Sequence, residues 1–343
     1  MMAPEELPIS FFTTSGKYDA PAIAGYRKKF QESRLDNPSF EELLTSLVKM
    51  HFLGACQRMM PLLETILISS IQVNVNISGL TTGVLATYET GNSDAAAGKY
   101  VFTAKSDLLF EYLDNYFGGN LPLSPDTRYT WEHEIIHMLD HCCISGLAYR
   151  REGPDATEIL VELILSFRSE GIAELFYFMK NHSQHRSIRA ARTQFLRRME
   201  SLRNWAWDNP LFVRNAHRAI RSDRNYYTIG TWMVLHVMGC EAYRHVTPEA
   251  ALVAEKIRKR QEMPDEEIIR MVKQALEIDN HSFIDCLTKR GPDGKPFVEY
   301  DELYDLARSV ELCRADLKRN WSKPTELSGD PMIVRIFRLM RPK

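Results

Sequence analysis

The pattern His133-Glu134-Ile135-Ile136-His137 constrains the fold and chemistry of this chain more than any other stretch. On an α-helix, residues four apart lie above one another on one face, so His133 and His137 can present two imidazole nitrogens to a single cation. Glu134 points to the same side, and its carboxylate can accept a proton from a water held near the metal. The pattern therefore predicts a helical metal site with the chemistry of zinc hydrolysis, provided that another segment supplies a third ligand.

The overall composition is that of an ordinary globular protein, with 44% hydrophobic and 26% charged residues and a formal net charge of -2. This charge gives no general attraction to nucleic acid or to a membrane surface. The first residues carry Glu5 and Glu6 where a secretory signal has basic side chains, and the most apolar stretch, 61–71, is too short to span a bilayer. The six cysteines have neither zinc-knuckle nor disulfide-framework spacing. We therefore expect a cytoplasmic protein with reduced thiols.

The N-terminal third predicts a helical scaffold followed by a small sheet. Residues 1–16 are expected to form an irregular arm. Ser39 and Glu42 form a capping box, which predicts the start of a helix that runs to about residue 68. Apolar and polar residues then alternate, which predicts half-buried strands ahead of the metal helix. The expected strands are 71–77, 84–88 and 99–103.

A long apolar helix, expected over 156–180, contains the best candidate for a third ligand. Its carboxylates need partners because so apolar a helix is largely buried. Glu170 and Glu174 are four residues apart, so one can bind a metal while the other bonds a ligating histidine. His141 lies eight residues beyond His133, a rise of about 12 Å along a helix, which is too far for one tetrahedral ion. Glu170 is therefore preferred over His141.

With these residues the chain resembles the gluzincin class of zinc metallopeptidases, which includes thermolysin-like enzymes and clostridial neurotoxin light chains. The class combines H-E-x-x-H on one helix with a glutamate ligand on a later helix and an acid four residues on. The resemblance implies that His133, His137 and Glu170 bind Zn²⁺, that Glu134 is the general base, and that Glu174 is the bonding partner of His133. The sequence from Glu170 to Glu174 is similar to the E-G-x-A-E motif of bacterial members of the class.

The chain also departs from that pattern in places. Thermolysin-like members have Asn before the glutamate ligand and Asp at the later acid, where this chain has Ser169 and Glu174. The G-x-M-E-N signature of related aminopeptidases is absent, which argues against aminopeptidase activity. The resemblance therefore implies an endopeptidase acting on polypeptides, in which the strand 99–103 pairs with an extended substrate as edge strands in the class do.

A tyrosine or a cation near residues 224–230 is expected to stabilise the oxyanion of the reaction, as gluzincins commonly arrange. Tyr227 is the first choice in this stretch, and Tyr226 and Arg224 are alternatives. Aromatic packing at the start of a helix explains the same residues without any catalytic role.

The expected fold is α+β and predominantly helical, with a gluzincin metallopeptidase core in which a small mixed sheet packs on the zinc helices. The expected divisions are an N-terminal arm and helical scaffold over 1–70, the metallopeptidase core over 71–245, and a C-terminal helical region over 246–343.

Residues 181–224 differ from the rest of the chain, with ten arginines, no lysine and three acidic residues. One interpretation is an acidic substrate or partner; another is a solvated helical face or pairing with acids of the same chain, such as those at 265–267. A non-catalytic, zinc-stabilised interaction module that binds an acidic partner through this segment is the alternative to an enzyme. The absence of lysine and the near-neutral chain argue against a nucleic-acid surface.

Overall fold

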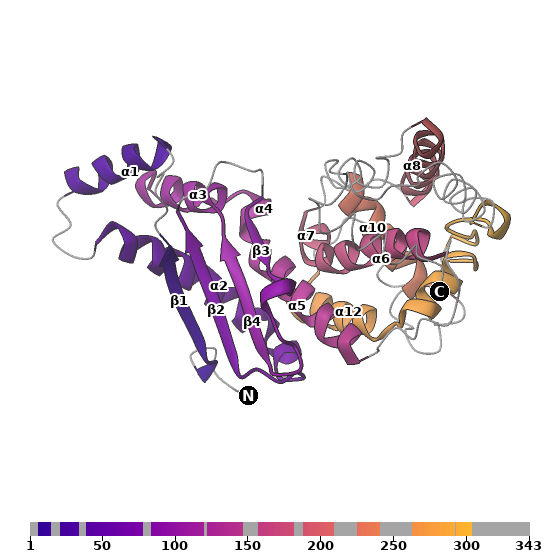
Figure 1. Cartoon of the computed structure of the whole chain (residues 1–343), viewed down its shortest axis with the longest axis horizontal. Coiled ribbons are helices and arrows are strands. Elements are labelled where there is room, and N and C mark those ends of the chain that lie inside the picture. The colour runs from indigo at the N-terminus through magenta and orange to yellow at the C-terminus, as the bar shows by residue number, and fades with distance from the viewer. Residues whose placement is uncertain are drawn as a thin grey trace, which may run out of the picture. The chain divides into compact units, whose positions relative to one another are not determined.

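The structure is a computed structural model. The residues that it describes are 6–14, 21–33, 39–77, 84–119, 122–146, 157–181, 188–208, 225–240, 263–291 and 293–303. Helices predominate among them, and the strands form one small mixed sheet (Figure 1). The expected mixed and mostly helical class is confirmed.

The chain folds into two compact units. Unit 1 comprises Met1–Ala148, Leu175–Asn181 and Glu262–Glu277, and unit 2 comprises Tyr149–Glu174, His182–Gln261 and Ile278–Lys343. Neither unit is a single continuous stretch of chain. The divisions expected at residues 70 and 245 stay predictions.

Unit 1 contains the sheet and the helices around it. Its elements are β1 (Ile9–Thr14), α1 (Pro21–Glu32), α2 (Phe40–Leu63), β2 (Ser70–Asn76), β3 (Ala86–Tyr88), the 3₁₀ turn η2 (Thr90–Asn92), β4 (Lys99–Ala104), α3 (Ser106–Phe117), α4 (Pro125–Arg128), α5 (Thr130–Gly146), α7 (Leu175–Lys180) and α12 (Asp265–Glu277). Unit 2 is helical where it is described. Its elements are α6 (Thr157–Ala173), α8 (Ile188–Asp208), α10 (Asn225–Met238) and α13 (Asn280–Leu287).

The sheet has the strand order β1-β2-β4-β3, with β1, β2 and β4 parallel and β3 antiparallel to β4. The expectation of an irregular arm over residues 1–16 is wrong, because Ile9 to Thr14 pair with β2 as an edge strand, with Ile9 opposite Ile71. A partner so distant in sequence leaves little local signal, which is why the strand is not evident from residues 1–16 alone. The alternation predicted for residues 71–77 is confirmed, since the odd-numbered side chains of β2 are buried.

A row of apolar side chains crosses the four strands and meets α2. Phe11, Val73, Phe102 and Tyr88 are register partners from β1 to β3. Phe52 of α2 contacts two of them, with ring centroids 6.1 Å from Phe11 and 5.2 Å from Phe102. Edge-to-face pairs of this kind add to the free energy gained by apolar burial. The row fixes the sheet on α2, which lies along one face of it (Figure 1).

β4 is an interior strand, so the expectation that residues 99–103 form a free edge for substrate is wrong. Its whole length pairs with β2 on one side. On the other side, Phe102 to Ala104 pair with β3. The segment that follows β3 continues this contact, because the carbonyl of Val101 accepts the N–H of Glu89 and the N–H of Val101 donates to Ser93 Oγ. The outer strands of the described sheet are β1 and β3.

Two helices differ in extent from their predicted ranges. The capping box of Ser39 and Glu42 is confirmed at the start of α2, but the helix ends at Leu63 because the following residues turn toward β2. The single helix expected over 156–180 is divided at Glu174 into α6 and α7.

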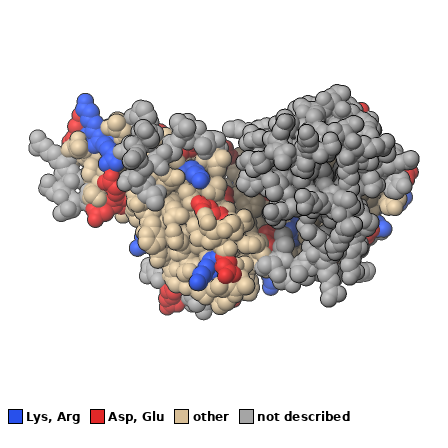
Figure 2. Space-filling model, in the orientation of Figure 1, with Lys and Arg blue, Asp and Glu red and all other residues tan. Residues whose placement is uncertain are grey.

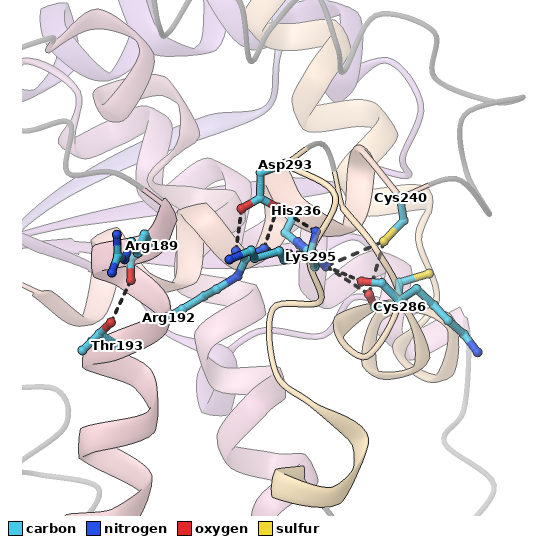
Figure 3. Close-up of polar contacts among 9 residues, drawn as sticks. Arg189, Arg192, Thr193, His236, Cys240, Cys286, Asp293 and Lys295 are labelled. Atoms are coloured by element: carbon cyan, nitrogen blue, oxygen red, sulfur yellow. Dashed lines mark hydrogen bonds and ion pairs between the residues drawn. The ribbon is translucent and has the colours of Figure 1, made fainter.

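A buried histidine ties α10 to the end of α13 in unit 2 (Figure 3). His236 Nε2 lies 3.3 Å from the carbonyl oxygen of Cys286 and 3.1 Å from that of Lys289. A Cβ atom added at Gly291 would lie 2.2 Å from His236 Nδ1, so only glycine fits against this ring. Burial, together with the nearby Arg192, lowers the pKa of His236 to about 4. The ring is therefore neutral at neutral pH.

No helix in the described part of the chain is both long enough and apolar enough to cross a membrane.

Candidate metal centre

The helix α5 carries the H-E-x-x-H residues on one face, and its opposite face is buried. Trp131, Ile135 and Leu139 are buried, whereas His133, Glu134 and His137 are half-buried. The indole Nε1 of Trp131 donates to the hydroxyl of Tyr112 at 3.0 Å. The apolar face thus holds α5 in the core of unit 1, which leaves the polar face for chemistry.

The two histidines of this face are placed as a pair of ligands to one ion would be. His133 Nε2 and His137 Nε2 lie 3.0 Å apart. Two nitrogens bound at 2.0–2.1 Å to a tetrahedral zinc ion would lie about 3.3 Å apart. The imidazoles therefore need little movement to share a cation.

Glu170 is the third member of the group. Its ligand oxygen and those of His133 and His137 lie within 4.8 Å of one another, and all three side chains are half-buried. The N–H of Glu174 donates to the carbonyl oxygen of Glu170 at 2.9 Å, which continues the helical spacing from α6 toward α7. The set of two imidazoles and one carboxylate is one that zinc binds in catalytic sites, with the fourth position open.

Glu134 is held by the main chain of the sheet. Its Oε2 accepts a hydrogen bond of 2.6 Å from the N–H of Tyr88, the last residue of β3. Nothing in the residue types of β3 indicates this contact, because the donor is a backbone group. Sequence reasoning therefore missed Tyr88.

The other polar groups near the end of α5 have partners outside the metal group. His141 Nδ1 lies 2.7 Å from the hydroxyl of Tyr88, and the thiol of Cys142 donates to the hydroxyl of Tyr100 at 3.3 Å. Burial raises the pKa of Cys142, which disfavours a thiolate ligand. Among the described residues, the group that could hold a metal contains Glu170 and not His141, and the choice of Glu170 as a ligand stays a prediction.

A buried ion pair fixes the residue before the first ligand. Glu132 is fully buried, and its Oε1 accepts bonds from Arg58 of α2 at 2.6 Å from Nε and 2.5 Å from an Nη atom. Burial raises the pKa of Glu132, and the guanidinium of Arg58 opposes that rise. The pair ties α5 to α2 beside His133.

In unit 2, α6 and α10 cross at two glycines that follow candidate site residues. A Cβ atom at Gly171 would lie 2.2 Å from the carbonyl carbon of Gly230, so the two backbones are in direct contact. Gly171 follows Glu170, and Gly230 lies three residues after Tyr227. This crossing fixes the backbone that carries Glu170 against the backbone that carries Tyr227.

The two tyrosines of α10 have different surroundings. Tyr226 is buried, and its hydroxyl forms a hydrogen bond with that of Ser166. Packing therefore accounts for this tyrosine without a catalytic role. Tyr227 is half-buried, and its catalytic role stays a prediction. Arg224 lies outside the described residues. Glu174 is half-buried at the junction of α6 and α7, and its bond to His133 stays a prediction.

Half of the arginine-rich segment, residues 182–187 and 209–224, lies outside the described residues. In the described part, α8, Arg192 forms two bonds of 2.5 and 2.7 Å with the carboxylate of Asp293 (Figure 3). Arg192 therefore pairs with an acid of the same chain. That acid is Asp293 and not one of those expected at 265–267. On the face drawn in Figure 2, the described charges of both signs are interspersed. An acidic partner stays a prediction.

The chain matches no protein-family model, no curated protein and no solved structure.

Proposed function

We propose that this chain is a zinc-dependent endopeptidase of the gluzincin type. The observation that carries the proposal is the approach of two Nε2 atoms, 3.0 Å apart, with a carboxylate oxygen of Glu170 in the same group. Three such ligands leave one position of a tetrahedral ion open, which is the arrangement of catalytic rather than structural zinc.

His133, His137 and Glu170 would hold the ion. When bound, zinc supplies Lewis acidity, which makes a water molecule more acidic and polarises a peptide carbonyl. All three ligand side chains are half-buried, so the group keeps partial exposure to solvent.

Glu134 is the general base of the proposed reaction. Its carboxylate, which accepts the N–H of Tyr88 at Oε2, takes the proton of the attacking water. The same carboxyl group then gives the proton to the nitrogen of the leaving amine. Tyr227 is proposed to donate its hydroxyl proton in a hydrogen bond to the carbonyl oxygen as negative charge develops there.

The substitution Glu134→Gln tests the proposal, because it keeps the size of the side chain and removes its basicity. We expect one zinc ion per chain in both proteins, and a loss of peptide hydrolysis of about 10²–10⁴-fold in the variant. Glu266→Gln, an exposed position on α12, is the matched control. Peptide cleavage that is equally fast in wild type and Glu134→Gln would exclude Glu134 as the base. A wild-type chain that binds zinc and cleaves no peptide in a proteome-wide screen would favour the interaction module.

A further inference from the structure

We infer that Tyr88 is a positioning residue for Glu134, acting through its main-chain N–H, an inference that rests on the proposed function. Its N–H donates to Glu134 Oε2 at 2.6 Å. This contact joins the last residue of β3 to the residue between the two histidine ligands in α5. Hydrogen bonds from N–H groups to carboxylates are among the stronger ones in proteins.

The register of the sheet explains why this N–H is free to bond α5. The N–H of Lys105 donates to the carbonyl of Leu85, and the N–H of Glu89 donates to the carbonyl of Val101. Residues 85, 87 and 89 therefore direct their main-chain polar groups toward β4. In an antiparallel pair the intervening residues direct theirs away. Tyr88 is such a residue, so its N–H lies on the outer side of β3.

The side chain of Tyr88 fixes the same strand to the same face of α5. Its hydroxyl lies 2.7 Å from His141 Nδ1, and its ring centroid lies 5.3 Å from that of Phe102. Glu134 and His141 are seven residues apart, so they lie on one face of the helix, two turns from each other. Burial raises the pKa of Tyr88 to about 12, which keeps the hydroxyl neutral. β3 is thus attached to α5 at two points.

The segment after β3 prevents the strand from sliding along α5. The Glu89 carboxylate accepts a bond from the Thr103 hydroxyl, and the Glu89 carbonyl accepts one of 2.8 Å from Ser93 Oγ. Ser93 Oγ in turn accepts the N–H of Val101 at 3.0 Å. These bonds lock the end of β3 to β4. The Tyr88 N–H is therefore a fixed donor.

A fixed donor restricts the rotamers of Glu134 before any substrate binds. A free glutamate side chain has three rotatable bonds, and ordering them during the reaction costs free energy. With Oε2 held by the Tyr88 N–H, the Glu134 carboxylate is already positioned before the reaction begins. Loss of the N–H should therefore lower kcat, while the three metal ligands, which are different residues, keep the ion.

The test compares Tyr88→Pro with Tyr88→Ala in the zinc-loaded full chain. Both variants lack the ring, but only proline lacks the N–H, and proline is tolerated where the N–H of an edge strand points outward. We expect kcat of Tyr88→Pro to be at least about tenfold below that of Tyr88→Ala, with similar KM, zinc content and Tm. Equal kcat in the two variants would overturn the inference.

A second measurement needs no turnover. In the NMR spectrum of the zinc-loaded chain, Glu134→Ala should move the amide proton of Tyr88 upfield and speed its exchange with solvent, because a bond to a charged acceptor is lost. An unchanged amide signal would overturn the inference even if Tyr88→Pro fails to fold. A wild-type chain without peptidase activity would refute the proposed function, and this signal would still report whether Tyr88 holds Glu134.

Discussion

The crossing of α6 and α10 makes Gly171→Ala a sharp test of the structure. The added Cβ would lie 2.2 Å from the carbonyl carbon of Gly230 and 2.7 Å from the backbone nitrogen of Thr231. Ordinary contacts begin at 3.4 Å, so relieving the closest one requires a shift of about 1.2 Å, the difference between 3.4 and 2.2. Both sides of the contact are helix backbone, which cannot move aside as a flexible side chain can.

Two opposing contributions set the change in the free energy of unfolding that Gly171→Ala should cause. Overpacking a close contact costs about 1–3 kcal/mol, and contact between two backbones belongs at the upper end. Alanine in place of glycine inside a helix stabilises the folded state by about 0.5–1 kcal/mol. We therefore expect a net loss of about 2 kcal/mol in the free energy of unfolding. Because Glu170 adjoins the substituted residue, zinc affinity should also fall by about tenfold or more.

Urea unfolding of wild type, Gly171→Ala and Gly54→Ala gives the comparison. Gly54 is also inside a helix, α2, but a Cβ there would meet only Arg58 Nη1 at 3.8 Å. The control should therefore be stabilised by about 0.5–1 kcal/mol. If Gly171→Ala is as stable as wild type, the close crossing of the two helices is wrong.

Two further predictions concern the metal and pH. Glu170→Gln should weaken zinc binding by at least about tenfold, measured by competition with a chelator, and unchanged affinity would exclude Glu170 as a ligand. His236 has a folded-state pKa of about 4 against an ordinary value of 6.5, so between these pH values the unfolded chain binds a proton that the folded chain does not. Stability should therefore fall by about 3 kcal/mol as pH drops from 7 to 4, and His236→Gln should show a correspondingly flatter dependence in urea unfolding.

Local patterns in the sequence predicted those features that depend on neighbouring residues. The capping box of Ser39 and Glu42 and the alternation from Ile71 to Ile77 were both confirmed. In each case the bonding groups or the buried face are set within one element. The pairing of His133 and His137 belongs to the same class, since it depends only on helical spacing.

Features that depend on distant partners could not be predicted in the same way. β1 is a strand because β2, about sixty residues later, pairs with it. β4 is interior because β3 and β2 both pair with it, which the order of strands along the chain does not reveal. The bond from Tyr88 to Glu134 uses a backbone donor, and every residue except proline has one.

The division of unit 1 among three stretches of chain has a consequence for its synthesis. α12, which packs against α2, α5 and α7, begins only at Asp265. Lys180 of α7 bonds the carboxylate of Asp265 at 2.6 Å and the carbonyl of Met263 at 2.8 Å. A ribosome that has made the sheet and α5 must therefore still produce more than a hundred residues, counted from Gly146 to Asp265, before the core around α5 can close. Truncation before residue 265 should expose that core. Because each unit is built from separate stretches of the chain, neither can be obtained by a single cut.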